Sequence, residues 1–397
     1  MRILISAGEA SGEMYGARLI KALRAVLAND LEFFGVGGPQ MRAAGCDIVV
    51  DAQDLSVVGI TEILGHLPKI WGLFHRLIAE ADRRKPDLAI VIDSPAFNWR
   101  VARQMKKRGI PVVYYVCPQF WAWRQGRVRL LRKYVDKALV IFPFEEKFYR
   151  DHGVDTEFVG HPLADLARPT IPRDEYAAQH GLDASKQWIV LMPGSRRKEV
   201  KMNLPEILQA ARVLGNEFEF LLPVALTLTP EFVQAQLGRP HPSKIADGGA
   251  LSLANVRLVP ETLPALAHSR AGLIASGTAT VEAAMMELPF VMVYRVTPLT
   301  YLLGRSTVKV PHFAMVNLIA GEEVVPELIQ RDFTAEKVVS RMRQIIPDGD
   351  QRKKMLDGLR RVKTLLRGQD NSSTHPADRA AQAIRDLCSR LQLSGNC

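Results

Sequence analysis

The sequence predicts an α/β protein of two doubly wound domains that face a central cleft, and three observations carry this prediction. The chain has 397 residues, more than a single hydrophobic core usually spans. Short apolar runs alternate with helix-like stretches, as in parallel sheets covered by helices. The alternation restarts near residue 188, beyond a hinge expected at His161-Pro162. We therefore expect a first domain over residues 1–165, a second over 166–350 and C-terminal helices over 351–397.

The first domain opens with a strand, a glycine loop and a helix, as nucleotide-binding domains do. Residues 2–6 (RILIS) predict the strand and residues 7–16 (AGEASGEMYG) the loop. The loop carries Glu9, Ser11 and Gly12, which we place near the cleft. Its glycines do not follow the GxGxxG spacing, so the pattern gives little support to a dinucleotide cofactor.

A second predicted strand of the first domain ends in a carboxylate residue, Asp93. Residues 88–92 (LAIVI) predict a buried strand, and Asp93 follows at its carboxyl end, where open parallel sheets bind ligands. Ser94 and Pro95 come next, so we expect the carboxylate to project into the loop region. A capping or Asx-turn aspartate without a ligand is the alternative.

Aromatic residues crowd the loop after the next strand. Residues 110–116 predict that strand, and residues 117–124 (CPQFWAWR) bring Trp123 and Arg124 to its end. This loop suits a wall that holds a large ligand. A plug between domains would have the same composition.

Two stretches of the first domain suggest contact with lipid. Residues 55–78 are strongly apolar, and we expect Gly59, Gly65 and Pro68 to break any long regular helix there. Packing in the core, an apolar ligand groove and a membrane surface are the three interpretations. The candidate contacts in this stretch are Val57, Ile60, Leu64 and Trp71. Residues 124–137 are basic, with Arg127, Arg129 and Arg132 as candidates for meeting anionic headgroups, although such a face is usually only solvated.

The second domain repeats the strand, glycine loop and helix. Residues 188–192 predict the strand, and Gly194, Ser195 and Arg196 follow in its loop. Backbone N–H groups and a guanidinium converge well on a diphosphate, so this loop is a candidate for binding one.

A further turn of this kind lies at Ser276-Gly277-Thr278, between an apolar run and a helix-like stretch. The first N–H groups of a helix lack intrahelical partners and carry the positive end of its dipole, so they attract anions. Glu282 falls about one helical turn later, where it could accept hydrogen bonds from sugar hydroxyls. A buried turn without a ligand is the alternative.

The amino-acid composition limits the classes of molecule that this protein could bind. The net charge of +10 fits polyanions, phosphorylated substrates or an anionic membrane. Among the polyanions, nucleic acid is the partner with the least support, because the sequence shows no zinc-finger spacing, RNP-like motif or basic tail. The four cysteines show no CxxC pairing, which argues against disulfides and structural zinc. No run is apolar enough for a signal peptide or a membrane span, so we expect a cytoplasmic protein.

Taken together, the motifs resemble those of the lipid-A-disaccharide synthases of Gram-negative bacteria over essentially the full chain. The matching stretches are AGEASGEMYG (7–16), VVGITEILG (57–65), IDSPAFN (92–98), VCPQFWAWR (116–124), FPFE (142–145), GHPLAD (160–165), PGSRRKEV (193–200), ASGTATVE (275–282) and NLIAG (317–321). One departure is the loop at Cys117 and Gln119-Phe120, where the family pattern has serine and valine variants.

The resemblance implies a GT-B glycosyltransferase with two Rossmann-like domains. Such an enzyme joins UDP-2,3-diacylglucosamine to 2,3-diacylglucosamine 1-phosphate (lipid X) and releases UDP, at the cytoplasmic face of the inner membrane. It uses no metal and no cofactor. The resemblance also implies that the last helix crosses to the first domain or swaps between the subunits of a homodimer.

An α-linked donor and a β-linked product require inversion, so a base must take the proton of the acceptor 6-hydroxyl. Asp93 is the candidate base, with Asn98 to orient it. Asn317 resembles a family residue near the donor, where it would touch diphosphate or sugar. A UDP-sugar 2-epimerase of the same architecture and a non-catalytic nucleotide- or lipid-binding protein are the rival readings.

Overall fold

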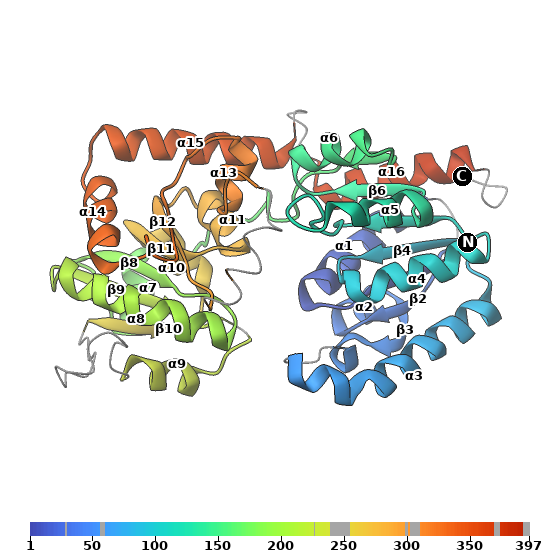
Figure 1. The fold of residues 1–397 in the computed structure, drawn as a ribbon, viewed down its shortest axis with the longest axis horizontal. Coiled ribbons are helices and arrows are strands. Elements are labelled where there is room, and N and C mark those ends of the chain that lie inside the picture. The colour runs from blue at the N-terminus through green and yellow to red at the C-terminus, as the bar shows by residue number, and fades with distance from the viewer. Residues whose placement is uncertain are drawn as a thin grey trace. The chain divides into compact units, whose positions relative to one another are not determined.

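A computed structural model describes residues 1–27, 30–55, 60–225, 227–238, 255–297, 301, 310–368 and 374–391, with backbone only at residues 10 and 60–67. The chain forms two compact units. The first comprises Met1–Ala164 and Leu366–Cys397, and the second comprises Asp165–Leu365 (Figure 1). Each unit has one parallel sheet with interleaved helices, so the predicted α/β class with two doubly wound units is confirmed.

The first unit contains a seven-stranded sheet in the order β3-β2-β1-β4-β5-β6-β7. Its strands are β1 (Arg2–Ala7), β2 (Glu32–Gly37), β3 (Cys46–Asp51), β4 (Leu88–Ile92), β5 (Val112–Tyr115), β6 (Lys137–Val140) and β7 (Thr156–Phe158). Its helices are α1 (Ala10–Val26), α2 (Pro39–Ala43), α3 (Ile60–Arg84), α4 (Pro95–Lys107), α5 (Val128–Tyr134), α6 (Pro143–Asp151) and α16 (Pro376–Arg390). Every residue of β4 is buried, because helices cover both faces of the sheet.

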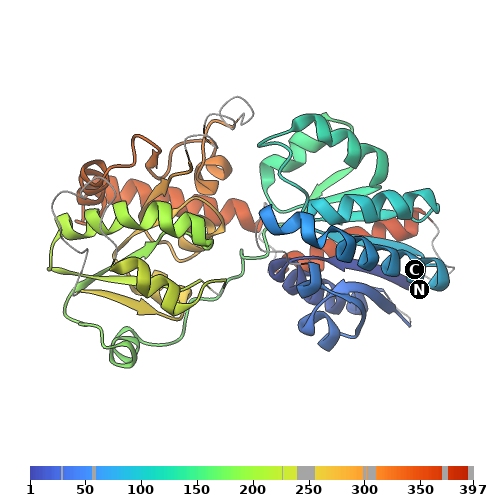
Figure 2. The same cartoon turned by 60° about the horizontal axis from the view of Figure 1, so that its bottom comes forward.

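Two contacts within the first unit bring elements close together, one between β1 and β2 and one between α1 and α16. A Cβ at Gly35 would lie 2.0 Å from the Ile5 carbonyl oxygen, so only glycine lets β2 run this close to β1. The C-terminal helix α16 packs against α1, and its ribbon lies among the elements of the first unit (Figure 2). The Arg379 side chain donates to the Val159 carbonyl oxygen at 2.8 Å, which fixes α16 beside the end of β7.

Helix α3 differs from the prediction for residues 55–78, which was that glycines and a proline would break any long regular helix there. It runs without interruption from Ile60 to Arg84 and contains both Gly65 and Pro68. A proline inside a helix costs roughly 3 kcal/mol. The same helix buries Phe74, Leu77 and Ala81, and burying large apolar side chains stabilises by a comparable amount.

The second unit contains a six-stranded sheet in the order β10-β9-β8-β11-β12-β13. Its strands are β8 (Gln187–Met192), β9 (Phe218–Pro223), β10 (Val256–Val259), β11 (Ala271–Ala275), β12 (Phe290–Tyr294) and β13 (Glu327–Ile329). Its helices are α7 (Arg173–His180), α8 (Arg197–Leu214), α9 (Pro230–Leu237), α10 (Thr262–His268), α11 (Thr278–Met285), α13 (Met315–Ala320), α14 (Ala335–Ile345) and α15 (Asp350–Arg367).

Both sheets have a point where the strand order reverses. In the first it falls between β1 and β4, and in the second between β8 and β11. Loops that leave neighbouring strands at such a point run to opposite faces, and the crevice between them is where open α/β sheets bind ligands. The loops after these four strands are therefore the candidates for substrate-binding and catalytic residues.

Candidate functional site

The loops after β1 and β4 meet closely in the first unit. A Cβ at Gly8 would lie 2.6 Å from the Ser94 Oγ, so the first loop passes directly over the second. Asp93 and Ser94 both adopt positive φ values, 47° and 46°. This left-handed conformation is unusual for residues other than glycine, and it persists only where the surroundings enforce it.

Two buried side chains hold the Asp93 backbone in that conformation. The Asp93 carbonyl oxygen accepts hydrogen bonds from the Asn98 amide at 2.9 Å and from the Tyr114 hydroxyl at 2.8 Å. Asn98 also donates to the Ile92 carbonyl oxygen at 2.8 Å, and the Ser6 hydroxyl donates to Asn98 at 2.7 Å. The network thus joins the ends of β1, β4 and β5.

Asn98 was expected to orient the Asp93 carboxylate, but its amide binds the backbone of that residue instead. Its position one turn into α4 points the side chain back at the strand end rather than toward the loop. Sequence reasoning missed Ser6 and Tyr114. Their positions at the carboxyl halves of two predicted strands were the only available signal.

Asp93 is half-buried, and the partial loss of water around its carboxyl group raises its pKa to about 6. The nearby negative charge of Glu9 raises the pKa further, and a hydrogen bond from the Ser94 N–H opposes the shift. A carboxyl pKa raised toward neutrality at a ligand-binding strand end is typical of a general base. Glu9 lies in the loop after β1 and is exposed. The predicted loop over residues 7–16 is shorter in the structure, because α1 begins at Ala10; exposed Ser11 and buried Gly12 therefore lie in the first turn of that helix.

The aromatic loop after β5 is anchored inside the first unit. The Trp121 indole donates to the buried Glu145 carboxylate at 2.8 Å, and that carboxylate also accepts from the Phe142 N–H at 3.1 Å. Burial raises the pKa of Glu145 to about 7. Trp123 is 45% exposed, and the Arg124 guanidinium lies 4.6 Å from its ring centre. Trp121 is therefore a core residue, and Trp123 is the ring that a ligand could reach.

In the second unit, a carboxylate of the protein already occupies the glycine loop after β8. The Glu199 carboxylate accepts from the Ser195 and Arg196 N–H groups at 3.1 and 3.2 Å, and pairs with the Arg196 guanidinium at 3.1 Å. The Arg196 side chain is 81% exposed. A Cβ at Gly194, whose φ is 123°, would lie 2.6 Å from the Glu199 side chain. The loop therefore binds an anion with the groups predicted for a diphosphate.

The turn after β11 begins α11 at Thr278. Gly277 has a φ of 144°, and apart from its two chain neighbours no described residue has an atom within 4 Å of where its Cβ would be. The Ser276 hydroxyl donates to the Phe313 carbonyl oxygen at 2.9 Å, so it helps to fix the turn. Burial raises the pKa of Glu282 above its ordinary value.

The hydrogen bonds of Asn317, the residue predicted to lie near the donor, are all made inside the second unit. It is fully buried, and its carbonyl oxygen accepts from the Val324 and Val325 N–H groups at 2.8 and 2.9 Å. Its amide donates to the Val325 carbonyl oxygen and to the Glu327 carboxylate at 2.9 and 2.8 Å. All the hydrogen-bonding groups of this side chain are used inside the protein, so direct contact with diphosphate or sugar would require them to exchange.

The candidate lipid contacts are only partly described. Val57 and the side chains of Ile60 and Leu64 lie outside what the structure describes. Trp71 on α3 is 58% exposed, and Arg127, Arg129 and Arg132 are all exposed around α5. None of the helices among the described residues is long and apolar enough to cross a membrane. Within the same residues, no group of three potential metal ligands occurs.

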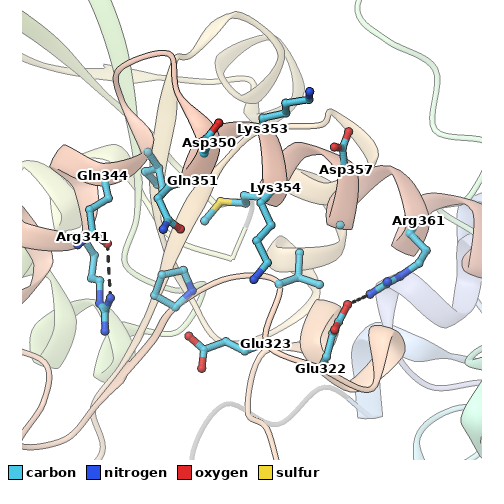
Figure 3. Close-up of a pocket in the computed structure, with 15 residues that line it drawn as sticks. Glu322, Glu323, Arg341, Gln344, Asp350, Gln351, Lys353, Lys354, Asp357 and Arg361 are labelled. Carbon is cyan, nitrogen blue, oxygen red and sulfur yellow. Dashed lines mark hydrogen bonds and ion pairs between the residues drawn. The ribbon is translucent and has the colours of Figure 1, made fainter.

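A hollow of about 700 Å³ in the second unit lies beside residues 322–326, between α14 and α15 (Figure 3). Its charged lining residues are Glu322, Glu323, Asp350 and Asp357 opposite Arg341, Lys353, Lys354 and Arg361. Four acids thus balance four bases, and Arg361 is paired with Glu322. This hollow contains none of the predicted site residues and has no excess charge to attract a ligand.

Comparison with known proteins relates this geometry to a family. The lipid-A-disaccharide synthetase family model matches residues 3–381. The lipid-A-disaccharide synthase of Koribacter versatilis is 52% identical over 392 residues, covering 98% of this chain and 99% of that protein. The synthase of Acidobacterium capsulatum is 50% identical, covering 92% of this chain and 91% of that protein.

Solved structures support the same architecture at much lower identity. The calicheamicin glycosyltransferase CalG4 superimposes with a TM-score of 0.59 at 15% identity, covering 98% of each chain. A UDP-GlcNAc 2-epimerase from Neisseria meningitidis gives 0.61 at 12% identity, covering 98% of this chain and 100% of that one. These likenesses show only the GT-B fold, whereas the sequence match distinguishes the synthases from the epimerases. The chain belongs to the lipid-A-disaccharide synthase family of glycosyltransferases.

Proposed function

We propose that this protein transfers 2,3-diacylglucosamine from its UDP derivative to the 6-hydroxyl of 2,3-diacylglucosamine 1-phosphate, with inversion and release of UDP. The observation that carries the mechanism is Asp93, a half-buried residue with a strained backbone and a carboxyl pKa of about 6, at the point where the strand order of the first sheet reverses. Family membership gives the reaction class, and the position and raised pKa of Asp93 support its choice as the base.

In the proposed step, the Asp93 carboxylate accepts the proton of the acceptor 6-hydroxyl. The acceptor oxygen bonds to C1 of the donor sugar while the bond from C1 to the UDP oxygen breaks, so negative charge leaves with the diphosphate. A base with a pKa near 6 is about nine-tenths ionised at pH 7, yet it holds a proton better than an ordinary aspartate.

The proposed donor site uses the second unit. The N–H groups of Ser195 and Arg196 and the guanidinium of Arg196 stabilise the departing diphosphate, as preorganised donors do at developing charge. Glu199 occupies these groups in the structure, so the diphosphate replaces the carboxylate when the donor binds. The turn at Ser276-Gly277-Thr278 offers further N–H groups, and Glu282 binds the ribose hydroxyls.

The proposed acceptor site uses the first unit, together with the cytoplasmic surface of the inner membrane. Both substrates carry acyl chains, and the apolar stretch that includes Val57, Ile60 and Leu64 would receive them. Exposed Trp71 and the basic residues Arg127, Arg129 and Arg132 support contact with anionic headgroups.

The test is incubation of the full-length protein with both diacylated substrates, with disaccharide 1-phosphate and UDP followed by mass spectrometry. Equal amounts of the two products are expected, with a β linkage at the new bond. Formation of a 2-epimer of the donor sugar, without disaccharide, would replace the proposal with the epimerase alternative. Binding of UDP without any turnover would support a non-catalytic protein.

A further inference from the structure

The second unit contains another hollow, of about 390 Å³, at the opposite edge of its sheet from the donor loops. It is lined by the first residues of β8, by Ser269 and Arg270 just before β11, and by the starts of α7 and α15. Parallel strands place the donor loops at their carboxyl ends, so this hollow at the amino ends is a separate place.

Positive charge dominates this hollow. Its lining includes Arg173, Lys186, Arg270 and Arg352, and none of its ten described lining residues is acidic. The hollow of Figure 3, in contrast, has equal numbers of acidic and basic lining residues, so an excess of positive charge is not common to all hollows of this unit. Four converging cations favour an anion of more than one charge.

Two exposed acids lie near these cations, Asp183 beside Lys186 and Asp348 beside the arginines, and they compensate the positive charge only weakly. Asp348 lies 2.6 Å from the Arg270 guanidinium and 3.9 Å from that of Arg352, but its side chain is 91% exposed. Two arginines thus share one solvated carboxylate, and exposed ion pairs of this kind contribute little. Burial is the main cause that lowers the pKa of Arg352 from its ordinary value; the charge of Arg270 lowers it further, and Asp348 opposes the shift.

The cations are held in place by the backbone. Arg173 stacks 3.9 Å from the centre of the Trp188 ring and donates to the Ala184 and Lys186 carbonyl oxygens at 2.6 and 2.7 Å. Arg270 donates to the Ile346 carbonyl oxygen at 2.6 Å. Because these guanidiniums are already ordered, a ligand would lose little of its binding free energy to ordering them.

An unsatisfied hydroxyl points to a ligand independently of the charge. The Ser269 Oγ is a buried atom with no hydrogen-bond partner among the described residues, and Ser269 lines the hollow. Leaving a buried hydroxyl unpaired is unfavourable, so such a group usually marks a missing partner. The Ser269 Oγ is shielded from the hollow in this conformation. Rotation of the side chain about χ1 would bring the hydroxyl to an anionic oxygen beside Arg270, where it could donate together with the neighbouring cations.

We propose that this basic hollow binds a phosphate group, taken either from free phosphate or from the headgroup of an anionic lipid. Phosphate offers several acceptor oxygens and up to two negative charges, which suits three guanidiniums, an ammonium and a hydroxyl. The site is distinct from the donor site, so it acts as an anchor or effector site and takes no part in the transfer.

The test is calorimetric titration of the full-length protein with inorganic phosphate. Lys186→Ala and Ser269→Ala are the chosen variants, since neither side chain donates to the backbone carbonyls that Arg173 and Arg270 cap. Each should weaken phosphate binding about tenfold, the usual loss when one charge-assisted contact is removed. Lys353→Ala, in the hollow of Figure 3, should leave this binding unchanged.

A second arm uses vesicles of phosphatidylcholine with and without phosphatidylglycerol. Binding of free phosphate that depends on Lys186 and Ser269 supports a soluble ligand. Binding of only the phosphatidylglycerol vesicles, weakened by the same two variants, supports a lipid headgroup. If neither phosphate nor these vesicles bind, or if both variants bind like the unmodified protein, the proposal is overturned.

Discussion

The loops at the two points of strand reversal are built in opposite ways. In the first unit, Asp93 is half-buried, and its strained backbone is held by Asn98 and Tyr114. In the second unit, Arg196 is exposed, and the loop amides bind the carboxylate of Glu199, a partner that can be exchanged. The first arrangement suits a group that must be ready to react, and the second suits a site that must bind and release UDP. The following predictions test this contrast.

The largest expected effect is that of Asp93→Asn. Asparagine cannot accept the acceptor proton, so kcat should fall by about 10² or more. Asp151→Asn, which removes an exposed carboxylate of the same unit, is the matched control and should leave kcat unchanged. Measured turnover of Asp93→Asn near that of the unmodified protein would remove Asp93 from the chemistry.

The same variant should also be more stable. Burial raises the pKa of Asp93 from 3.8 to about 6, so the folded state binds its proton more tightly than the unfolded state. The ionised carboxylate therefore opposes folding, and its stabilising proton is lost as pH rises from about 4 to about 6. Asp93→Asn should raise the free energy of unfolding by about 3 kcal/mol at pH 7.5 and by almost nothing near pH 4. Urea unfolding at both pH values is the measurement, and equal gains at both would contradict the role of buried charge.

The next effect concerns the second unit. Arg196→Ala should weaken UDP binding at least about tenfold, because one charge-assisted contact to the diphosphate is lost. Arg197→Ala removes the neighbouring arginine, which lies over Phe232, and should leave UDP binding unchanged. Calorimetric titration with UDP compares the two. Equal affinities for both variants would place the diphosphate elsewhere.

A smaller effect, in the opposite direction, is expected at Glu199. Glutamine can still accept a hydrogen bond from the loop N–H groups but carries no charge to compete with a diphosphate. Glu199→Gln should therefore bind UDP roughly threefold to tenfold more tightly, the range of one modest electrostatic contact. Glu336→Gln, in the first turn of α14, is the control. Weaker UDP binding by Glu199→Gln would show that its carboxylate supports the ligand.

The smallest change tests how Asp93 is held. Tyr114→Phe removes one of the two side-chain hydrogen bonds to the Asp93 carbonyl oxygen. We expect kcat to fall roughly fivefold with KM for the donor unchanged, as for the loss of one neutral hydrogen bond in the transition state. Tyr176→Phe also removes a hydroxyl that donates to a carbonyl oxygen, but in the second unit, and should have no such effect. A change in KM alone would mean that Tyr114 shapes the substrate site instead.

The sequence predicted the α/β class and the glycine loop after β8 well, because buried parallel strands such as β4 are continuous apolar runs. It failed for α3, where packing of one helix face outweighed the cost of Pro68, and it placed the loop after β1 over residues 7–16, although α1 already begins at Ala10. It did not give the hydrogen-bond partners of Asn98 and Asn317, since a sequence pattern does not show which atoms a buried amide reaches. The contact of Glu199 with its own loop depends on the conformation at Gly194, which spacing alone did not reveal.

The pH dependence of kcat/KM tests the central claim most directly, because it reports the essential base in the free enzyme. With Asp93 as that base, kcat/KM should fall about tenfold per pH unit below a midpoint near pH 6 and level off above it. A profile that stays flat down to pH 4.5 would contradict the account, since an ordinary exposed carboxylate would then suffice.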